Sequence, residues 1–152
     1  MPDDDVYFRH RNLPLALLHA RERVMLKFRP LLTAQGLTEQ QWRIIRVLLQ
    51  DSPLEPRDIG ERCRLSSPSL TGVLARMEDM GLVARKAVKH DQRRVLIALT
   101  ARSHTLAERL APQIEAVYAR IEGALGTEFC DGLYKALDKL IAKLDEPPVG
   151  KL

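Results

Sequence analysis

The sequence predicts a mainly α-helical chain with one small β-hairpin, and two observations carry this prediction. Apolar residues recur at steps of three and four over most of the 152 residues, which is the spacing of one helix face. Between residues 82 and 99 the pattern changes. Segments 82–86 and 94–99 contain β-branched side chains, and they flank residues 89–92, which include no apolar side chain. Two short strands around a polar turn form a hairpin.

The composition is that of an ordinary globular protein, with 45% hydrophobic and 29% charged residues. No apolar run approaches the roughly 18 residues that span a bilayer. The acidic start of the chain has no apolar signal region. We therefore expect a cytoplasmic protein with no membrane partner. Cys63 and Cys130 have no metal-ligand spacing, so we expect reduced thiols, no metal site and no cofactor.

Capping residues set the predicted bounds of the first two helices. The first helix runs over about 13–34, with Asn12 as its cap, and Pro30 should end or bend it. Thr38 and Gln41 have the spacing of a capping box, in which each side chain bonds the other residue's backbone amide. This box predicts the start of a second helix.

Two shorter helices follow. Pro56 suits the first turn of a third helix. Ser66 or Ser67, followed by Pro68, begins a fourth, and Gly81 is a left-handed stop for it. The apolar stripe of the fourth helix comprises Leu70, Val73, Leu74 and Met77. Two short helices joined by a tight turn form a helix-turn-helix.

The fourth helix has the side chains of a DNA-reading helix. The major groove admits a helix only if its leading face is slim, and hydroxyl groups there can donate to or accept from several bases. Exposed serine and threonine are also common at ordinary helix starts, so this prediction depends on the order of the elements. The residues that we expect to contact DNA from this helix are Ser66, Ser67, Ser69, Thr71 and, at a phosphate, Arg76.

A basic hairpin follows directly, as the wing of a winged helix-turn-helix does. Residues 85–94 carry five basic side chains against the single Asp91. Such a cluster attracts phosphate, and an ordinary solvated turn is the alternative. We expect Lys89, Arg93 and Arg94 to contact the backbone or the adjacent minor groove of double-stranded DNA.

Two longer helices complete the chain, and we expect Thr100 to cap one and Thr127 to cap the other. All 152 residues should form a single domain, with a winged helix-turn-helix core over 38–100 and additional helices over 12–34 and 101–145. These additional helices carry more apolar stripe than a small reader domain can cover. We therefore expect a homodimer held by them.

Several stretches carry a family resemblance. Residues 91–100 read DQRRVLIALT, and residues 68–72 read PSLTG. They resemble the wing signature and the recognition helix of the MarR (multiple antibiotic resistance regulator) family. Residues 16–22 and 37–44 resemble the branch of that family that represses homoprotocatechuate catabolism.

This resemblance implies a dimer whose two recognition helices read a near-palindromic operator. It also implies that Asp91 forms an ion pair that holds Arg93 in the wing. Ser103 stands where many relatives have glycine, a departure that we expect to be harmless in a helix.

Arg21 is the unusual residue of the first helix, because it lies on the apolar stripe. We expect Arg21, Trp42 and Arg43 to bind a small aromatic carboxylate as effector, since a guanidinium fork fits a carboxylate and an indole offers a stacking face. His19 could add a donor. The alternatives are that Arg21 extends its charge to water or pairs with an acidic residue across the dimer.

These features favour a DNA-binding repressor that a small aromatic acid releases. One alternative is a winged-helix module used for protein contacts, and another is a redox sensor of the same family that uses Cys63 or Cys130. The sequence has no nucleophile elbow, no glycine-rich phosphate loop and no paired-carboxylate motif. We therefore expect that the protein is not an enzyme and has no catalytic residue.

Overall fold

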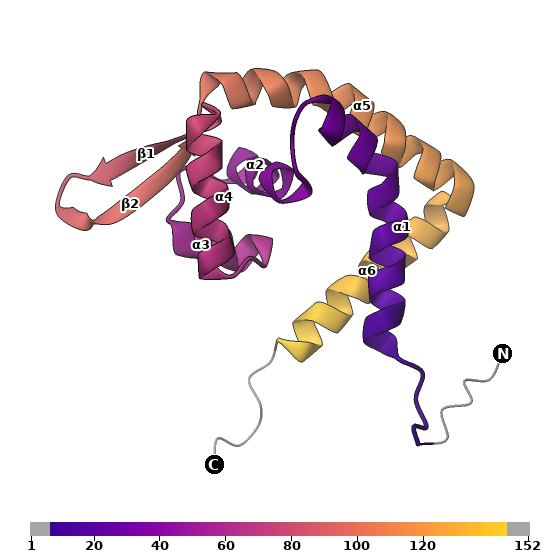
Figure 1. Ribbon diagram of the computed structural model, residues 1–152. Coiled ribbons are helices and arrows are strands. Elements are labelled where there is room, and N and C mark those ends of the chain that lie inside the picture. The colour runs from indigo at the N-terminus through magenta and orange to yellow at the C-terminus, as the bar shows by residue number, and fades with distance from the viewer. Residues whose placement is uncertain (1–6, 146–152) are drawn as a thin grey trace, which may run out of the picture. The chain divides into compact units, whose positions relative to one another are not determined.

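The computed structural model describes residues 7–145, which are mainly helical (Figure 1). The acidic start of the chain lies outside the described residues. Close contacts divide the chain into two compact units, Met1–Gln113 and Ile114–Leu152, and the division falls within α5. In chain order the elements are α1 (Leu13–Ala34), α2 (Glu39–Gln50), α3 (Pro56–Cys63), α4 (Ser67–Asp79), β1 (Val83–Val88), β2 (Asp91–Leu99), α5 (Ala101–Leu125) and α6 (Thr127–Leu144).

The capping predictions for α1 and α2 are confirmed. The Asn12 side chain accepts a hydrogen bond from the Leu15 amide at 3.1 Å. The capping box is complete, because Thr38 Oγ1 accepts from the Gln41 amide at 3.1 Å and the Gln41 side chain accepts from the Thr38 amide at 3.0 Å. Pro30 does not end α1, which continues through it to its predicted last turn.

The core of the first unit forms where α2, α3 and α4 pack together. Gly60 allows the close approach of α3 and α4, because a Cβ there would lie 3.3 Å from both the Leu70 side chain and the Leu65 carbonyl oxygen. The opposite face of α4 is exposed to solvent. The four apolar residues predicted for the α4 stripe are all buried: Leu70, Val73, Leu74 and Met77.

The hairpin is confirmed, with β1 and β2 antiparallel and extending away from the helices of the first unit (Figure 1). Its turn is shorter than predicted. Lys89 and His90 form the turn, whereas Asp91 and Gln92 already belong to β2. The pairing register shifts at Val88, so the strands reach further toward the turn than the apolar pattern indicates.

A single residue before α3 adds a minimal third strand to the hairpin. The Leu54 amide donates to the Ile97 carbonyl at 3.0 Å, and the Ile97 amide donates to the Leu54 carbonyl at 2.7 Å. Ile97 is fully buried. This bridge joins the base of β2 to the start of the helix-turn-helix.

Thr100 and Ser103 join the hairpin to α5. Thr100 Oγ1 accepts from the Ser103 amide at 3.3 Å, as an N-cap does, and donates to the Gly81 carbonyl at 2.7 Å. Ser103 is fully buried, and its hydroxyl donates to the Leu82 carbonyl. The departure at Ser103 is therefore a packed, hydrogen-bonded position and not merely a tolerated one.

The predicted cap of α6 is wrong by one residue. Thr127 is the first helical residue, and Gly126 is the N-cap, with no side-chain cap bond. Gly126 has φ of +89°, a conformation that glycine adopts without strain.

Both α1 and α6 leave apolar side chains in water. Only Phe28 and Leu32 of α1 are buried. Leu17 and Val24, between which Arg21 lies on the apolar stripe expected from the sequence, are exposed. In α6 only Cys130 is buried. No helix within the described residues is long and apolar enough to cross a membrane. The large exposed apolar residues of α6 are Phe129, Leu133, Tyr134, Ile141 and Leu144.

The Ser103 contacts predict a stability effect. Ser103→Ala removes the hydroxyl that bonds the Leu82 carbonyl in a buried place, so the free energy of unfolding should fall by about 1–2 kcal/mol. Thr127→Ala is the matched control, because Thr127 is exposed and caps nothing, and it should change stability by less than about 0.5 kcal/mol. Urea unfolding at one protein concentration measures the free energy of unfolding of both variants and of the wild type. Equal midpoints for Ser103→Ala and the wild type would contradict a stabilising role of the Ser103 hydroxyl.

Candidate nucleic-acid interface and effector pocket

The start of α4 presents a row of small hydroxyl groups. Ser66, Ser67, Ser69 and Thr71 are all exposed, whereas the apolar stripe of the same helix is buried. Ser66 Oγ donates to Ser69 Oγ at 3.0 Å, and Thr71 Oγ1 donates to the Ser67 carbonyl at 2.9 Å. The predicted slim face is therefore formed and carries no large side chain at its leading end.

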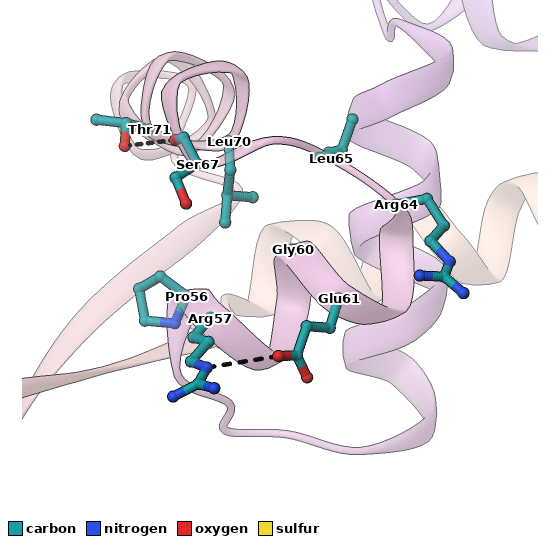
Figure 2. A pocket seen from close by; sticks show the side chains of 9 residues that line it. All are labelled: Pro56, Arg57, Gly60, Glu61, Arg64, Leu65, Ser67, Leu70 and Thr71. Carbon is teal, nitrogen blue, oxygen red and sulfur yellow. Dashed lines mark hydrogen bonds and ion pairs between the residues drawn. The ribbon is translucent and has the colours of Figure 1, made fainter. Parts of the chain in front are cut away.

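An open cleft of about 550 Å³ lies between α3 and α4 (Figure 2). Ser67 and Thr71 border it from α4. Arg57 and Glu61 border it from α3 and form an ion pair of 3.4 Å. Figure 2 shows Arg57 and Glu61 directed toward one another. The hydroxyl groups thus border solvent and are not packed into the protein.

Arg76 lies further along α4 and is exposed. Its Nε donates to the Gly72 carbonyl of the same helix at 3.4 Å. No acidic side chain within residues 7–145 pairs with it. This leaves the guanidinium charge available for a phosphate.

The basic side chains of the hairpin divide into two groups. Arg85 pairs with Glu78 at 2.7 Å, and Arg94 pairs with Glu55. Lys89 is exposed at the turn, and it forms no ion pair within the described residues. The charge open to a ligand is thus smaller than the sequence indicates.

The Asp91–Arg93 ion pair is not formed, which corrects that expectation. Asp91 Oδ1 instead accepts from the Arg93 backbone amide at 3.0 Å. Asp91 therefore shapes the backbone at the start of β2 and leaves the Arg93 guanidinium exposed. The short spacing of two residues favours this bond, because an Asp side chain readily reaches the amide two positions ahead.

Two of the four predicted effector residues line one pocket. A pocket of about 570 Å³ is bordered by Arg21 on α1 and Arg43 on α2, together with Leu18, Thr38, Glu39 and Gln40. Trp42 is half-buried and His19 is exposed, and neither lines this pocket. The structure thus brings the two arginines together but not the indole or the imidazole.

Glu39 was missed by the sequence reasoning and is the centre of this region. Its carboxylate pairs with Arg21, and with Arg43 at 2.8 Å. Arg29 reaches it at 3.5 Å and pairs with Glu22 at 3.0 Å. Arg21 therefore has a partner in its own chain, which neither alternative for Arg21 included. Glu39 and Arg43 have the i,i+4 spacing of a helix ion pair, a signal that was available.

Arg43 has a second contact that leads to the helix-turn-helix. Its Nη1 donates to the carbonyl of Cys63, the last residue of α3, at 2.8 Å. Burial raises the pKa of the Cys63 thiol, and the charge of Arg43 opposes this only in part. A thiol with a raised pKa stays protonated at neutral pH and reacts slowly with oxidants.

The sequence is similar to those of known transcription regulators. A model of the MarR family matches residues 35–94. The chain is 42% identical to the homoprotocatechuate degradative operon repressor of Escherichia coli over 133 residues, which cover 88% of this chain and 90% of that protein.

Solved structures agree with this. The transcriptional regulator PA4135 has 40% sequence identity and a TM-score of 0.85, and the match covers 91% of this chain and all of that one. NadR, crystallised in complex with 4-hydroxyphenylacetate, has 38% identity and a TM-score of 0.76, with 91% and 96% of the two chains covered. The predicted winged helix-turn-helix is confirmed, and the chain belongs to the MarR family of transcription regulators.

Proposed function

We propose that this regulator binds double-stranded DNA as a homodimer and represses an operon for the catabolism of an aromatic compound. In this proposal α4 enters the major groove, and the hairpin of β1 and β2 reaches the adjacent minor groove or backbone. The observation that carries it is the exposed hydroxyl row of α4, followed directly by a hairpin whose Lys89 and Arg93 form no ion pair within residues 7–145.

The dimer is supported by the apolar faces of α1 and α6. Single exposed apolar residues are ordinary, but contiguous apolar patches are typical of an interaction site. Leu133 and Leu144 recur on α6 at helical spacing with Phe129, and all three are exposed. A two-fold dimer would cover such faces and present two copies of α4 to a near-palindromic operator.

A small aromatic carboxylate is the effector that the pocket at Arg21 and Arg43 supports best. Its volume of about 570 Å³ lies within the range of small-molecule sites, roughly 300–1,000 Å³. NadR was crystallised with such an acid, and the relative from Escherichia coli is named as the repressor of a homoprotocatechuate operon. An incoming carboxylate has to share or replace Glu39 on the two guanidinium groups.

The two alternative functions make different predictions from this proposal. A winged helix used only for protein contacts would show little salt-sensitive binding to duplex DNA. A redox sensor needs a reactive thiolate, whereas burial raises the pKa of the Cys63 thiol.

Arg93→Ala tests the wing. The exposed guanidinium should contact a phosphate, so its removal should weaken binding to every duplex and flatten the salt dependence by about 0.9 for each phosphate that is no longer neutralised. Arg109→Ala removes the same charge from an exposed position on α5 and should leave the slope unchanged. Anisotropy titrations at several salt concentrations give both slopes. An unchanged slope for Arg93→Ala would refute the wing contact.

Phe129→Glu tests the dimer. Phe129 is 56% exposed in the single chain, so a charge there should not disturb the folded chain but should oppose burial in an apolar interface. We expect a shift toward monomer and a loss of full-operator binding. Lys135→Glu on the opposite face of α6 should leave the dimer intact. Light scattering over a range of protein concentrations measures the molar mass of each variant. A wild-type protein that is monomeric at all concentrations would contradict the proposed dimer.

Titration with 4-hydroxyphenylacetate tests the effector. Trp42 is the single tryptophan and the chain neighbour of Arg43, which lines the pocket, so its fluorescence should change on binding. DNA affinity should fall by about 5–150-fold. Arg21→Ala should lose this response and keep its operator affinity without ligand. Arg29→Ala is the matched control, because Arg29 contacts Glu39 but does not line the pocket. If both variants respond like the wild type, the effector binds elsewhere.

A further inference from the structure

We propose that Arg94 is a positioning residue and not a DNA contact. With Glu55 it holds the base of β2 against the start of α3, and it thereby sets where the neighbouring Arg93 lies on DNA. This inference rests on the proposed DNA binding and assigns the two adjacent arginines of the wing to different tasks.

The contact joins two parts of the chain that are 39 residues apart. Arg94 Nε donates to Glu55 Oε1 at 2.6 Å, and the Nη2 of the same guanidinium also contacts that oxygen. Glu55 is the N-cap residue of α3, yet its side chain makes no cap bond. Its carboxylate pairs with Arg94 and does not cap the helix.

This ion pair supplies a second point of attachment beside the bridge between Leu54 and Ile97. Leu54 precedes Glu55, and the bridge is made by two backbone hydrogen bonds of 3.0 and 2.7 Å. One short bridge fixes a position along β2 but leaves the strand free to pivot. A second contact three residues closer to the turn of the hairpin also sets the direction of the strand.

The contacts of Arg93 and Arg94 separate their tasks. Both arginines lie between Asp91 and Val95, where the pairing register of β2 with β1 shifts, so the direction of each side chain is taken from its own contacts. Arg94 faces Glu55, and the side chain of Arg93 is exposed and forms no ion pair within residues 7–145. A hairpin held in this direction therefore presents Arg93 to solvent, where DNA would lie.

Four variants test this division: Arg94→Ala, Glu55→Gln, the exchanged pair Glu55→Arg with Arg94→Glu, and Arg93→Ala. Binding is measured to a duplex that the wild type selects from a random pool and to a random-sequence duplex of the same length, at several salt concentrations. Urea unfolding of each variant reports stability.

We expect Arg94→Ala and Glu55→Gln each to weaken binding to the selected duplex by about two- to five-fold, the range expected for one exposed ion pair. Their salt slopes should match that of the wild type, whereas Arg93→Ala should flatten the slope. Combining Arg94→Ala with Glu55→Gln should cost no more than either change alone. The exchanged pair should restore affinity, which a direct contact of Arg94 with phosphate would forbid.

A flattened slope for Arg94→Ala, with tighter binding for Glu55→Gln, would overturn the proposal and make Glu55 a competitor of DNA for Arg94. Unchanged affinity in both variants would overturn it as well. If the wild type binds no duplex, the proposed function fails instead. The ion pair is then judged by the unfolding experiments, where Arg94→Ala and Glu55→Gln should still be non-additive.

Discussion

The helix-turn-helix depends on one constraint, the burial of one face of α4. Leu74 and Met77 are held in the core that α2 and α3 form with it, and Gly60 removes the Cβ that would keep α3 and α4 apart. Because that face is fixed, the opposite face has one orientation, and its hydroxyl groups stand on a rigid element. If one of these side chains lost its packing in the core, α4 could rotate. Its hydroxyl groups would then turn away from the DNA groove that α4 is proposed to read.

Features that depend on neighbours in the sequence were predictable. The capping box of Thr38 and Gln41, the start of α4 after Ser66 and the left-handed Gly81 all follow from spacings of a few residues, and the structure has each of them. The turn of the hairpin was predicted too long, because Asp91 and Gln92 are polar but extended. Polarity alone does not separate an exposed strand end from a turn.

Features that join distant segments were not predictable. Nothing in the sequence links Glu55 with Arg94 or Leu54 with Ile97, because these contacts arise only when the hairpin folds back onto the start of α3. The pocket bordered by Arg21 and Arg43 shows the same limit. Arg21 was recognisable as a charge on an apolar stripe, but its partner Glu39 lies on another helix, and the position of Trp42 outside the pocket follows from how the two helices pack.

The apolar faces of α1 and α6 have a consequence for how stability should be expressed. Side chains such as Leu18 and Leu144, which are 53% and 77% exposed in the single chain, keep most of their contact with water until something covers them. If a second copy covers these faces, association contributes directly to the free energy that keeps the chain folded. The melting temperature then rises with the amount of protein present, so a midpoint for this regulator has meaning only together with the concentration at which it was measured.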